Sequence, residues 1–431
     1  MFRRKRGAAG TDGGRFAQQV WPTRMMLAGA KRRIICSEGV PEPVEDRIIA
    51  WLWCAVVLAS PFYALPSGLP QAADWIMLVL VLFCYLRGES RWGTGIGLAR
   101  VTWPLLVFVG YAFLLTLFWA SRLGDTKLLL HPAYYAFNVL ALLAFIRSYW
   151  RQGPAFLRTV GYVFCASVLF QSGLTLTRYQ VGLRQTATFN NPNQLGYYSL
   201  LAGSCVALAQ LRFGMSRVAA GSALLGCLWL AAISLSKAAI AGVAVLLALV
   251  AKARPSVVLV VCLLALVAVQ TVDLSPLAAS VTERVARIGK EVDDSVEGRA
   301  YDRIWKYKEN LLLGAGEGAT YRFGRGREIH SSFGTLLFSY GVPGFVLFCT
   351  FLYKAYHLSG FRCFQFLLPA LLYGVTHQGL RFTEFWILLA FVLCAGMESQ
   401  GASGQRRQRA TYGRAVAARF RVQPGRRYTA A

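Results

Sequence analysis

The run VTWPLLVFVGYAFLLTLFWA, residues 101–120, decides the fold class of this chain. It holds no charged side chain over a length that lets an α-helix cross the hydrocarbon of a bilayer. Comparable runs recur along all 431 residues, of which 56% are hydrophobic and 15% charged. Because a water-soluble core cannot bury so many such helices, the sequence predicts an all-α polytopic membrane protein.

Further segments have the hydropathy of a membrane-spanning helix, so we expect about twelve transmembrane helices. Nine fall within residues 48–272 and three within residues 331–397. They are residues 48–66, 72–87, 101–120, 131–147, 157–176, 193–211, 218–234, 237–251, 255–272, 331–353, 361–378 and 383–397.

The placement of positive charge predicts the orientation. The formal net charge is +26, and much of it lies in a basic arm at residues 1–47 and a basic tail at residues 398–431. With the N-terminus inside, every loop on that side is also net basic, as cytoplasmic loops of membrane proteins are. We therefore expect both termini in the cytoplasm, and the basic ends to attract anionic membrane lipids rather than nucleic acid.

Residues 273–330 form a long segment that this topology places outside. The segment holds ten basic and ten acidic residues, so it lacks the positive bias of a cytoplasmic loop. Apolar residues at helical spacing predict two short amphipathic helices at the outer membrane surface. Arg299, Arg303 and Lys306 follow one stripe of the second helix, as either a solvated face or a ligand-binding one.

Ionisable residues are scarce within the predicted spans and gather at their outer ends. They are Asp74, Lys237, His377, Arg381 and Glu384. A transporter driven by protons or sodium needs such groups near the bilayer centre. The distribution instead favours an enzyme or receptor that acts at the external face on a lipid-bound substrate.

The stretch RQTATFNNPNQLG, residues 184–196, contains a helix-start signal. Asn191 suits the N-cap and Pro192 the first turn, so a membrane helix is expected to begin here. Its free N–H groups and positive dipole end would form an anion site beside Arg184. Alternatively, these residues only cap the start of a helix and bind no anion.

A second cluster runs from Gly298 and Arg299 through a glycine run at residues 314–318 to His330. The glycine run lacks the ending of a phosphate-binding Walker loop. His330 lies where the chain re-enters the membrane, with Ser331 or Ser332 as the expected cap. The basic residues that precede His330 should favour its neutral form, which can act as a base.

Three elements, in this order on a chain of about twelve spans, resemble the O-antigen ligase and polymerase superfamily of bacterial surface-glycan enzymes. They are FNNPNQLG at 189–196, SLSKA at 234–238, and the succession from Gly298-Arg299 through the glycine run to His330, followed by GVPG at 341–344. The resemblance covers roughly residues 178–351. Two positions depart from it: Ser331 stands where asparagine is usual, and Lys237 where arginine is usual.

This resemblance implies a C-type glycosyltransferase-like fold in the bacterial inner membrane, with the active site facing the periplasm. The donor would be an undecaprenyl-diphosphate-linked glycan, used without cofactor, nucleotide sugar or metal. The acceptor would be another lipid-linked repeat for a polymerase or lipid A core for a ligase. The Ser331 departure favours the polymerase slightly; a flippase for lipid-linked sugars and a non-catalytic scaffold remain open.

The resemblance also assigns roles to residues of this sequence. His330 would be the catalytic base that takes the proton of the acceptor hydroxyl. The donor diphosphate would be bound by Arg184, Arg299 and Arg327. Substrate would be positioned by Asn191, Asn193 and Lys237.

Overall fold

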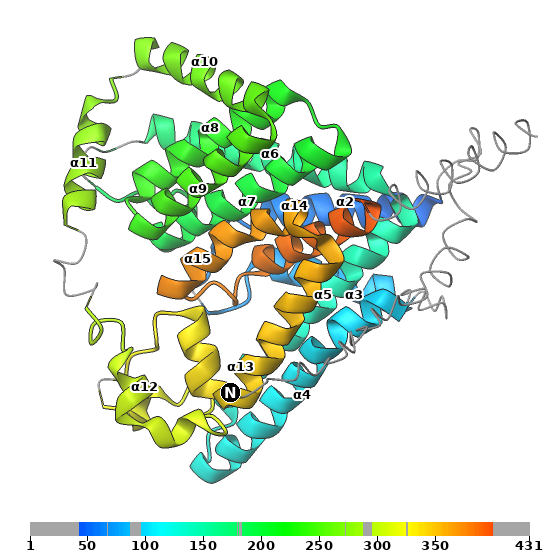
Figure 1. Ribbon diagram of the computed structural model, residues 1–431, viewed down its shortest axis with the longest axis vertical. Helices are drawn as coiled ribbons and strands as arrows, with labels where there is room; N and C mark the ends of the chain where they lie inside the picture. The colour runs from blue at the N-terminus through cyan, green and yellow to red at the C-terminus, as the bar shows by residue number, and fades with distance from the viewer. Residues whose placement is uncertain are drawn as a thin grey trace, which may run out of the picture.

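The computed structural model describes residues 43–66, 68–86, 96–178, 180, 183–271, 273–287, 295–324 and 326–399. The basic arm up to residue 42 and the tail from residue 400 lie outside these residues, as does Arg325. The described chain consists of α-helices, short 3-10 turns and loops, with no strand among them. The predicted all-α class is therefore confirmed (Figure 1).

Each predicted span overlaps a helix in the described residues, although the first, 48–66, extends past the end of its helix. In chain order the helices are α2 Val44–Ala59, α3 Ala72–Leu86, α4 Ile96–Leu123, α5 Leu130–Gln152, α6 Pro154–Thr177, α7 Pro192–Phe213, α8 Arg217–Ser234, α9 Lys237–Ala253, α10 Pro255–Thr271, α13 Ser332–Ser359, the run α14 Phe361–Phe364, η5 Gln365–Leu367 and α15 Leu368–Thr376, and a last helix over 383–399. A 3-10 turn, η1 Thr126–Leu129, leads into α5.

Within the described residues, five helices are long and apolar enough to cross a membrane, or six if α10 and the following α11, Ser275–Ala286, are one bent span. The five are Gly97–Leu123, Thr126–Gln152, Pro154–Thr177, Arg217–Ser234 and Ser332–Ser359. The hydropathy of α7 is lower than that of these five helices. α7 is enclosed by protein rather than lipid, so polar residues such as Ser199 and Ser204 are buried in it. These long apolar helices indicate a membrane protein.

Large apolar side chains are exposed in stripes along several helices. On α10, Leu259, Leu263 and Leu266 recur at helical spacing and are 54–60% exposed. On α4, Leu114 is 70% and Leu117 55% exposed. Monomeric soluble proteins rarely show contiguous apolar surface of this extent, so these stripes are suited to contact with lipid chains.

The core forms around two enclosed helices, α7 and the helix over 383–399. Almost every side chain of α7 from Leu195 to Gln210 is buried. Its neighbours approach closely at small residues: a Cβ on Gly196 would lie 2.7 Å from the Cβ of Ala239, and one on Gly161 2.4 Å from that of Ala209. Such small-residue contacts let helix backbones pack tightly where lipid provides no hydrophobic driving force.

Contacts between helix ends define two opposite faces. On one, Arg151 pairs with Asp46 at 2.6 Å and the Tyr149 hydroxyl donates to Glu398 at 2.6 Å, which joins the end of α5 to both ends of the described chain. Those chain ends lie on the same side in Figure 1. We call the other face, which holds the N-terminus of α7 and the C-terminus of α15, the site face.

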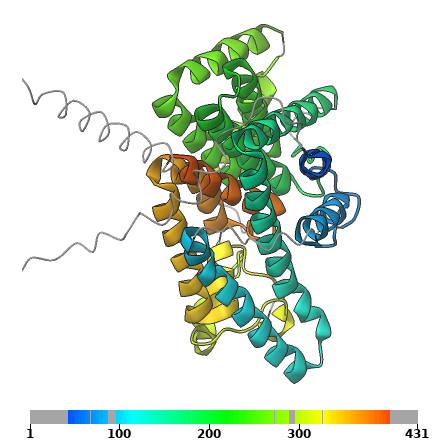
Figure 2. The same ribbon diagram turned by 90° about the vertical axis from the view of Figure 1, so that its right-hand side faces the viewer.

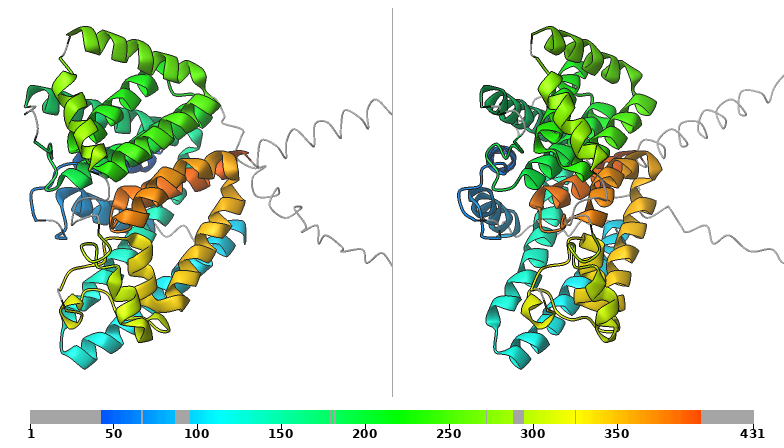
Figure 3. Two further views of the ribbon diagram at one scale, coloured as in Figure 1. Left: turned by 60° about the vertical axis from the view of Figure 1, so that its left-hand side comes forward. Right: turned by 90° about the vertical axis from the view of Figure 1, so that its left-hand side faces the viewer.

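Residues 295–330 fold against the site-face ends of α4, α5 and α13 (Figures 2 and 3). The first amphipathic helix is present as α11. The second short helix is present only in part. α12, Asp302–Lys306, has five residues and is followed by the 3-10 turns η3, Lys308–Leu311, and η4, Thr320–Arg322. Ala300, at φ +57°, interrupts any helix that would begin before it.

Of the two interpretations left open for the basic stripe on that helix, the solvated face applies to Lys306 and not to Arg303. Arg299 precedes α12, Lys306 is exposed beside Asp302, and Arg303 is only 5% exposed. Arg303 is covered because Phe323 packs back over it, with the guanidinium carbon 5.4 Å from the ring centroid. Sequence spacing could not reveal this return of the chain.

α13 is broken at Gly341, whose φ of +64° is non-helical. Pro343 has no N–H, so the Ser339 carbonyl loses its partner four residues on. The N–H of Gly316 donates to that carbonyl at 2.9 Å, and the N–H of Ala315 donates to Phe338 at 2.9 Å. The glycine run therefore docks on the break in α13.

Candidate functional site

The N-terminus of α7 forms the first part of the candidate site. As predicted, Asn191 is the N-cap, its side chain accepting from the Asn193 N–H at 2.8 Å, and Pro192 is the first helical residue. Arg184 donates to the Asn193 side-chain oxygen at 2.7 Å and to the Ser234 carbonyl at 3.1 Å. A fixed guanidinium thus stands beside the positive end of a helix, an arrangement that suits an anion.

The break between α8 and α9 lies next to it. Leu235 adopts φ +49°, which reverses the chain, and Ser236 occupies the N-cap position of α9. Lys237 opens α9 and donates to the Arg287 carbonyl at 3.1 Å. Lys237 therefore ties this break to the end of α11.

α15 connects these elements to the second cluster. The Tyr373 hydroxyl donates to the Asn193 carbonyl at 3.0 Å, and Arg299 donates to the Thr376 carbonyl. One turn of α15 thus brings the two predicted diphosphate-binding arginines to the same place.

Aromatic stacking holds this turn of α15. The Tyr373 ring stacks on Tyr197 of α7 at 4.2 Å between centroids, and the His377 ring stacks on Tyr373 at 4.5 Å. His377 had been noted only as a residue at a helix end. Its backbone carbonyl accepts from the Ser332 N–H at 3.1 Å, so it also fixes the start of α13.

His330 lies directly beside Arg299. Its backbone N–H donates to the Arg299 carbonyl at 3.1 Å, and its own carbonyl accepts from the Tyr301 hydroxyl at 3.1 Å. The side chain of His330 is exposed. Ser331 is the predicted cap of α13 and accepts from the Gly334 N–H at 3.0 Å. The backbone of His330 is thus fixed by hydrogen bonds at both its N–H and its carbonyl, while its imidazole is exposed.

The structure gathers most of the predicted site residues but not all. Arg184 contacts Asn193, Arg299 contacts His330, and α15 joins the two pairs. Arg327 lies apart: it is exposed and makes no hydrogen bond or ion pair with any residue that the structure describes.

Backbone strain gathers in the same segments. Across the described ranges, the non-glycine residues with positive φ are Ala187, Leu235 and Ala300, at +50°, +49° and +57°. Each lies in one of the three loops that carry Arg184, Lys237 and Arg299. A left-handed alanine or leucine costs about 1–3 kcal/mol and persists only where its surroundings hold it, as functional sites often do.

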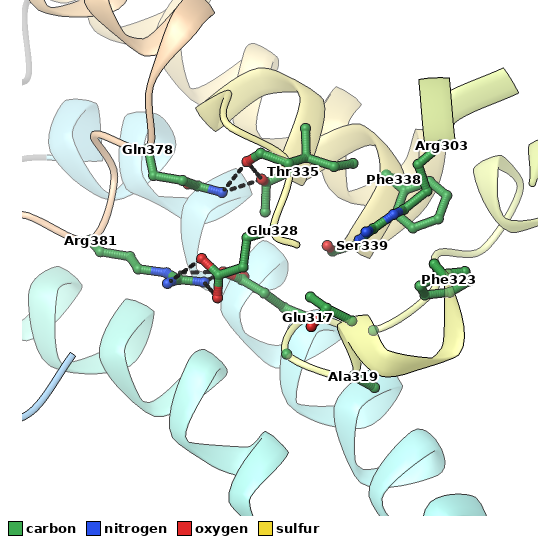
Figure 4. A pocket seen from close by; sticks show the side chains of 14 residues that line it. Arg303, Glu317, Ala319, Phe323, Glu328, Thr335, Phe338, Ser339, Gln378 and Arg381 are labelled. Carbon is green, nitrogen blue, oxygen red and sulfur yellow. Dashed lines mark hydrogen bonds and ion pairs between the residues drawn. The ribbon is translucent and has the colours of Figure 1, made fainter. Parts of the chain in front are cut away.

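An ion cluster centred on buried Glu317 supports the His330 segment, and the sequence does not predict it. Arg381 donates to Glu317 at 2.6 Å and pairs with Glu328 at 3.0 Å (Figure 4). The Tyr340 hydroxyl donates to Glu317 at 2.8 Å, and the His131 imidazole lies 3.7 Å from it. The cluster spans residues far apart in sequence, so only the isolated charges at helix ends hinted at it.

The electrostatics of this cluster favour the charged forms. Burial by itself would raise the pKa of Glu317, but Arg381, His131 and Tyr340 hold it below its ordinary value. Burial likewise opposes the charge of Arg381, yet Glu317 and Glu328 raise its pKa above the usual range. A nearly inaccessible carboxylate is therefore kept ionised by its partners.

The glycine run makes this burial possible. A Cβ on Gly318 would lie 2.2 Å from Nε2 of His131, and one on Gly316 would lie 2.7 Å from the Trp119 ring. Glycine alone lets the backbone between them approach α4 and α5 so closely. The glycine run is thus packed against α4 and α5.

Two hollows lie in this region. A small one is lined by the ion cluster together with Arg303, Thr335 and Gln378 (Figure 4). A larger one, of about 220 Å³, lies between α12 and the residues Phe323, Gly324 and Arg327. Arg303 belongs to the walls of both, and Arg327 to the wall of the larger one.

The geometry offers anion binding beside an exposed imidazole. Two arginines and a helix N-terminus can stabilise a charged phosphate group, and a neutral imidazole can accept a proton. The described residues contain no group of three or more His, Cys, Asp or Glu side chains placed to hold a metal ion. Compared with known proteins, the chain matches no family model and no curated protein.

Proposed function

We propose that this protein transfers a glycan from undecaprenyl diphosphate to an acceptor sugar hydroxyl at the periplasmic face of the bacterial inner membrane. The observation that carries the proposal is the convergence on α15 of Arg184 with Asn193 and of Arg299 with His330. A cationic site beside a base is what a diphosphate leaving group and a hydroxyl acceptor require.

In this proposal the donor diphosphate docks between Arg184 and Arg299, at the N-terminus of α7. His330 takes the proton from the acceptor hydroxyl as its oxygen forms the new bond to the anomeric carbon. The bond from that carbon to the diphosphate oxygen breaks, and lipid diphosphate leaves with the bonding electrons. The guanidiniums and the helix N-terminus stabilise its charge.

The proposed architecture is a C-type glycosyltransferase-like fold of about twelve spans. The site face is periplasmic and the face that holds the Arg151–Asp46 pair is cytoplasmic. This assignment agrees with the basic loops on the second face and with the zero net charge of residues 273–330. Asn191 and Lys237 position substrate at the helix starts they occupy.

The acceptor in this proposal is a second lipid-linked repeat, which makes the enzyme a polymerase. Ser331 supports that choice over ligation to lipid A core, because its hydroxyl caps α13 and its side chain is buried. The residue after His330 therefore presents no amide to an acceptor. A ligase is the alternative that the same geometry would serve.

Reconstitution tests the proposal. Purified protein in liposomes would receive lipid-linked donor with either a second donor or lipid A core, and the products would be separated on a gel. A ladder indicates polymerisation and one shifted band ligation. We expect His330→Ala to insert normally and to form neither product, with exposed Lys308→Ala as the active control. Products from the His330→Ala protein would refute the assignment.

The same preparation separates the enzyme from a flippase for lipid-linked sugars. A flippase moves donor between leaflets without changing its glycan, so it would yield neither a ladder nor a shifted band. In cells, loss of the enzyme should leave lipid-linked repeat on the periplasmic leaflet, whereas loss of a flippase leaves it on the cytoplasmic one. Accumulation on the cytoplasmic leaflet would favour the flippase.

A further inference from the structure

Arg303 is a buried charge without a matching acceptor. It is 5% exposed, and its guanidinium makes no hydrogen bond or ion pair with any residue in the described ranges. Burial lowers the pKa of Arg303, although the Asp302 and Glu328 carboxylates act in the opposite direction. Charged groups are rarely buried unless something pairs with them.

Two carboxylates act electrostatically on Arg303, and both also pair with other cations. Asp302 pairs with Lys306 at 2.8 Å, and Glu328 pairs with Arg381 at 3.0 Å. What remains around the guanidinium is largely aromatic, since it lies 5.4 Å from the Phe323 centroid. Figure 4 shows it reaching from α12 into the space beside Phe338. No carboxylate of the described residues forms an ion pair with this guanidinium, so it can bind an anionic ligand.

The larger hollow offers room for that anion. Its volume is about 220 Å³, below the usual range for whole drug-sized ligands and suited to one sugar ring. Its walls carry three cations, two carboxylates and two aromatic rings, namely Arg303, Lys306, Arg327, Glu297, Asp302, Tyr307 and Phe323. Tyr307 and Phe323 meet edge to face at 5.1 Å.

This mixture of groups is suited to carbohydrate recognition. Guanidiniums form paired hydrogen bonds with a carboxylate or phosphate. Carboxylates accept from sugar hydroxyls, and aromatic rings supply apolar area with a defined geometry. Since the cations outnumber the carboxylates, the hollow favours a sugar that carries negative charge.

The hollow adjoins the proposed reaction centre. Ala300 lines it and directly follows Arg299, whose carbonyl accepts from the His330 N–H at 3.1 Å. Arg327, on its rim, precedes His330 by three residues. A sugar held here would belong to a glycan chain that continues to the neighbouring site.

We infer that this hollow is a subsite for an acidic sugar of the transferred glycan, with Arg303 and Arg327 binding its oxyanion. The inference rests on the proposed function for its substrate. It gives Arg327 a partner other than the donor diphosphate. The oxyanion is the carboxylate of a uronic acid or a phosphate substituent, and both have the chemistry that a guanidinium recognises.

Binding to the purified full-length protein in nanodiscs tests this inference. The probes are three end-labelled sugars: a disaccharide that contains glucuronic acid, its neutral glucose counterpart, and a phosphorylated disaccharide of equal length. We expect at least one acidic probe to bind about tenfold more tightly than the neutral one. Whichever acidic probe binds better identifies the oxyanion. Equal affinity for all three would overturn the inference.

The variants separate recognition from folding. Arg303→Met should abolish the preference for the acidic probe and leave the melting temperature unchanged or higher, because an unpaired buried charge is removed. Arg327→Gln, at an exposed position, should weaken the preference without any effect on folding. Lys308→Gln removes an equal charge outside the hollow. It should change neither the preference for the acidic probe nor the melting temperature. If Arg303→Met unfolds the protein, the binding preference of Arg327→Gln for the acidic probe decides whether the inference stands.

His330→Ala separates this inference from the proposed function. The variant should lose glycan transfer and keep the acidic preference of the hollow. Transfer that persists in His330→Ala would refute the catalytic proposal and leave the subsite standing. Transfer lost as proposed, with no acidic preference in the unaltered protein, would refute the subsite alone.

Discussion

Arg381 donates a hydrogen bond of 2.6 Å to Glu317, although 64 residues separate the two along the chain. Glu317 is 3% exposed, and the same guanidinium pairs with Glu328 at 3.0 Å. Glu328 precedes His330 by two residues, and Arg381 follows the helix whose Thr376 carbonyl binds Arg299. The pair therefore fixes the segment that carries the proposed base relative to the proposed diphosphate site.

Arg381→Met should destabilise the protein strongly, because it leaves Glu317 buried without its cation. Loss of one partner from a buried ion pair costs about 3–5 kcal/mol, which a shift in the thermal or SDS unfolding midpoint would report. Lys306→Met breaks an exposed pair with Asp302 and should cost about 0–1 kcal/mol. Equal midpoints for the two variants would contradict the structural role of Arg381.

Acid should weaken the fold through Glu317. Its pKa in the folded protein lies below the ordinary value of 4.5, so the unfolded chain binds a proton first as pH falls. Stability from this group is complete above about pH 4.5 and is lost as pH drops through the lowered pKa. Unfolding midpoints measured from pH 7 to pH 3 should decline less in Glu317→Gln. Parallel curves would exclude this contribution.

Gly318→Ala should disturb the docked glycine run. The added Cβ would meet His131 at 2.2 Å, on a backbone with φ +94°. We expect a loss of about 1–3 kcal/mol in stability, together with reduced glycan transfer. Gly326→Ala is the matched control, since its φ of +65° carries a backbone penalty with no atom within 4 Å of the new Cβ. Similar losses of stability in the two variants would show that the effect comes from the positive φ and not from the contact with His131.

Arg184→Gln and Arg299→Gln should each lower kcat for glycan transfer by about 10²–10³, since preorganised charge stabilisation has this effect in other enzymes. Both variants should insert normally. Steady-state kinetics with lipid-linked donor would measure the change. Arg287→Gln, an exposed change near the same face, should stay within twofold of the parent. A change confined to KM would indicate that the arginines bind donor without assisting the reaction.

A reporter inserted at the site face should lie in the periplasm. Alkaline phosphatase placed after exposed Gly326 should be active, because the enzyme folds only outside the cytoplasm. The same insertion after Gly214, at the C-cap of α7 on the opposite face, should be inactive. Activity at Gly214, or none at Gly326, would remove the basis of the proposed function.

Local signals in the sequence predicted the positions of the long apolar helices and the N-cap of α7. Hydropathy placed the apolar segments, and cap chemistry identified Asn191 and narrowed the cap of α13 to Ser331 or Ser332, because each depends on neighbours a few residues away. The burial of Arg303 and the pairing of Glu317 with Arg381 depend on segments distant in sequence. Their residues were visible as isolated charges, but single-sequence patterns do not reveal which distant groups meet.

The broken helix α13 and the glycine run also set an order of assembly. The run at residues 314–318 is synthesised before the Ser339 carbonyl that binds it, and well before Arg381. Until those groups arrive, Glu317 has no cation and must stay in water. The run can therefore dock only once the last two helices are inserted, which makes closure of this lobe a late event in biogenesis. A chain truncated before Arg381 should expose residues 314–330 to protease.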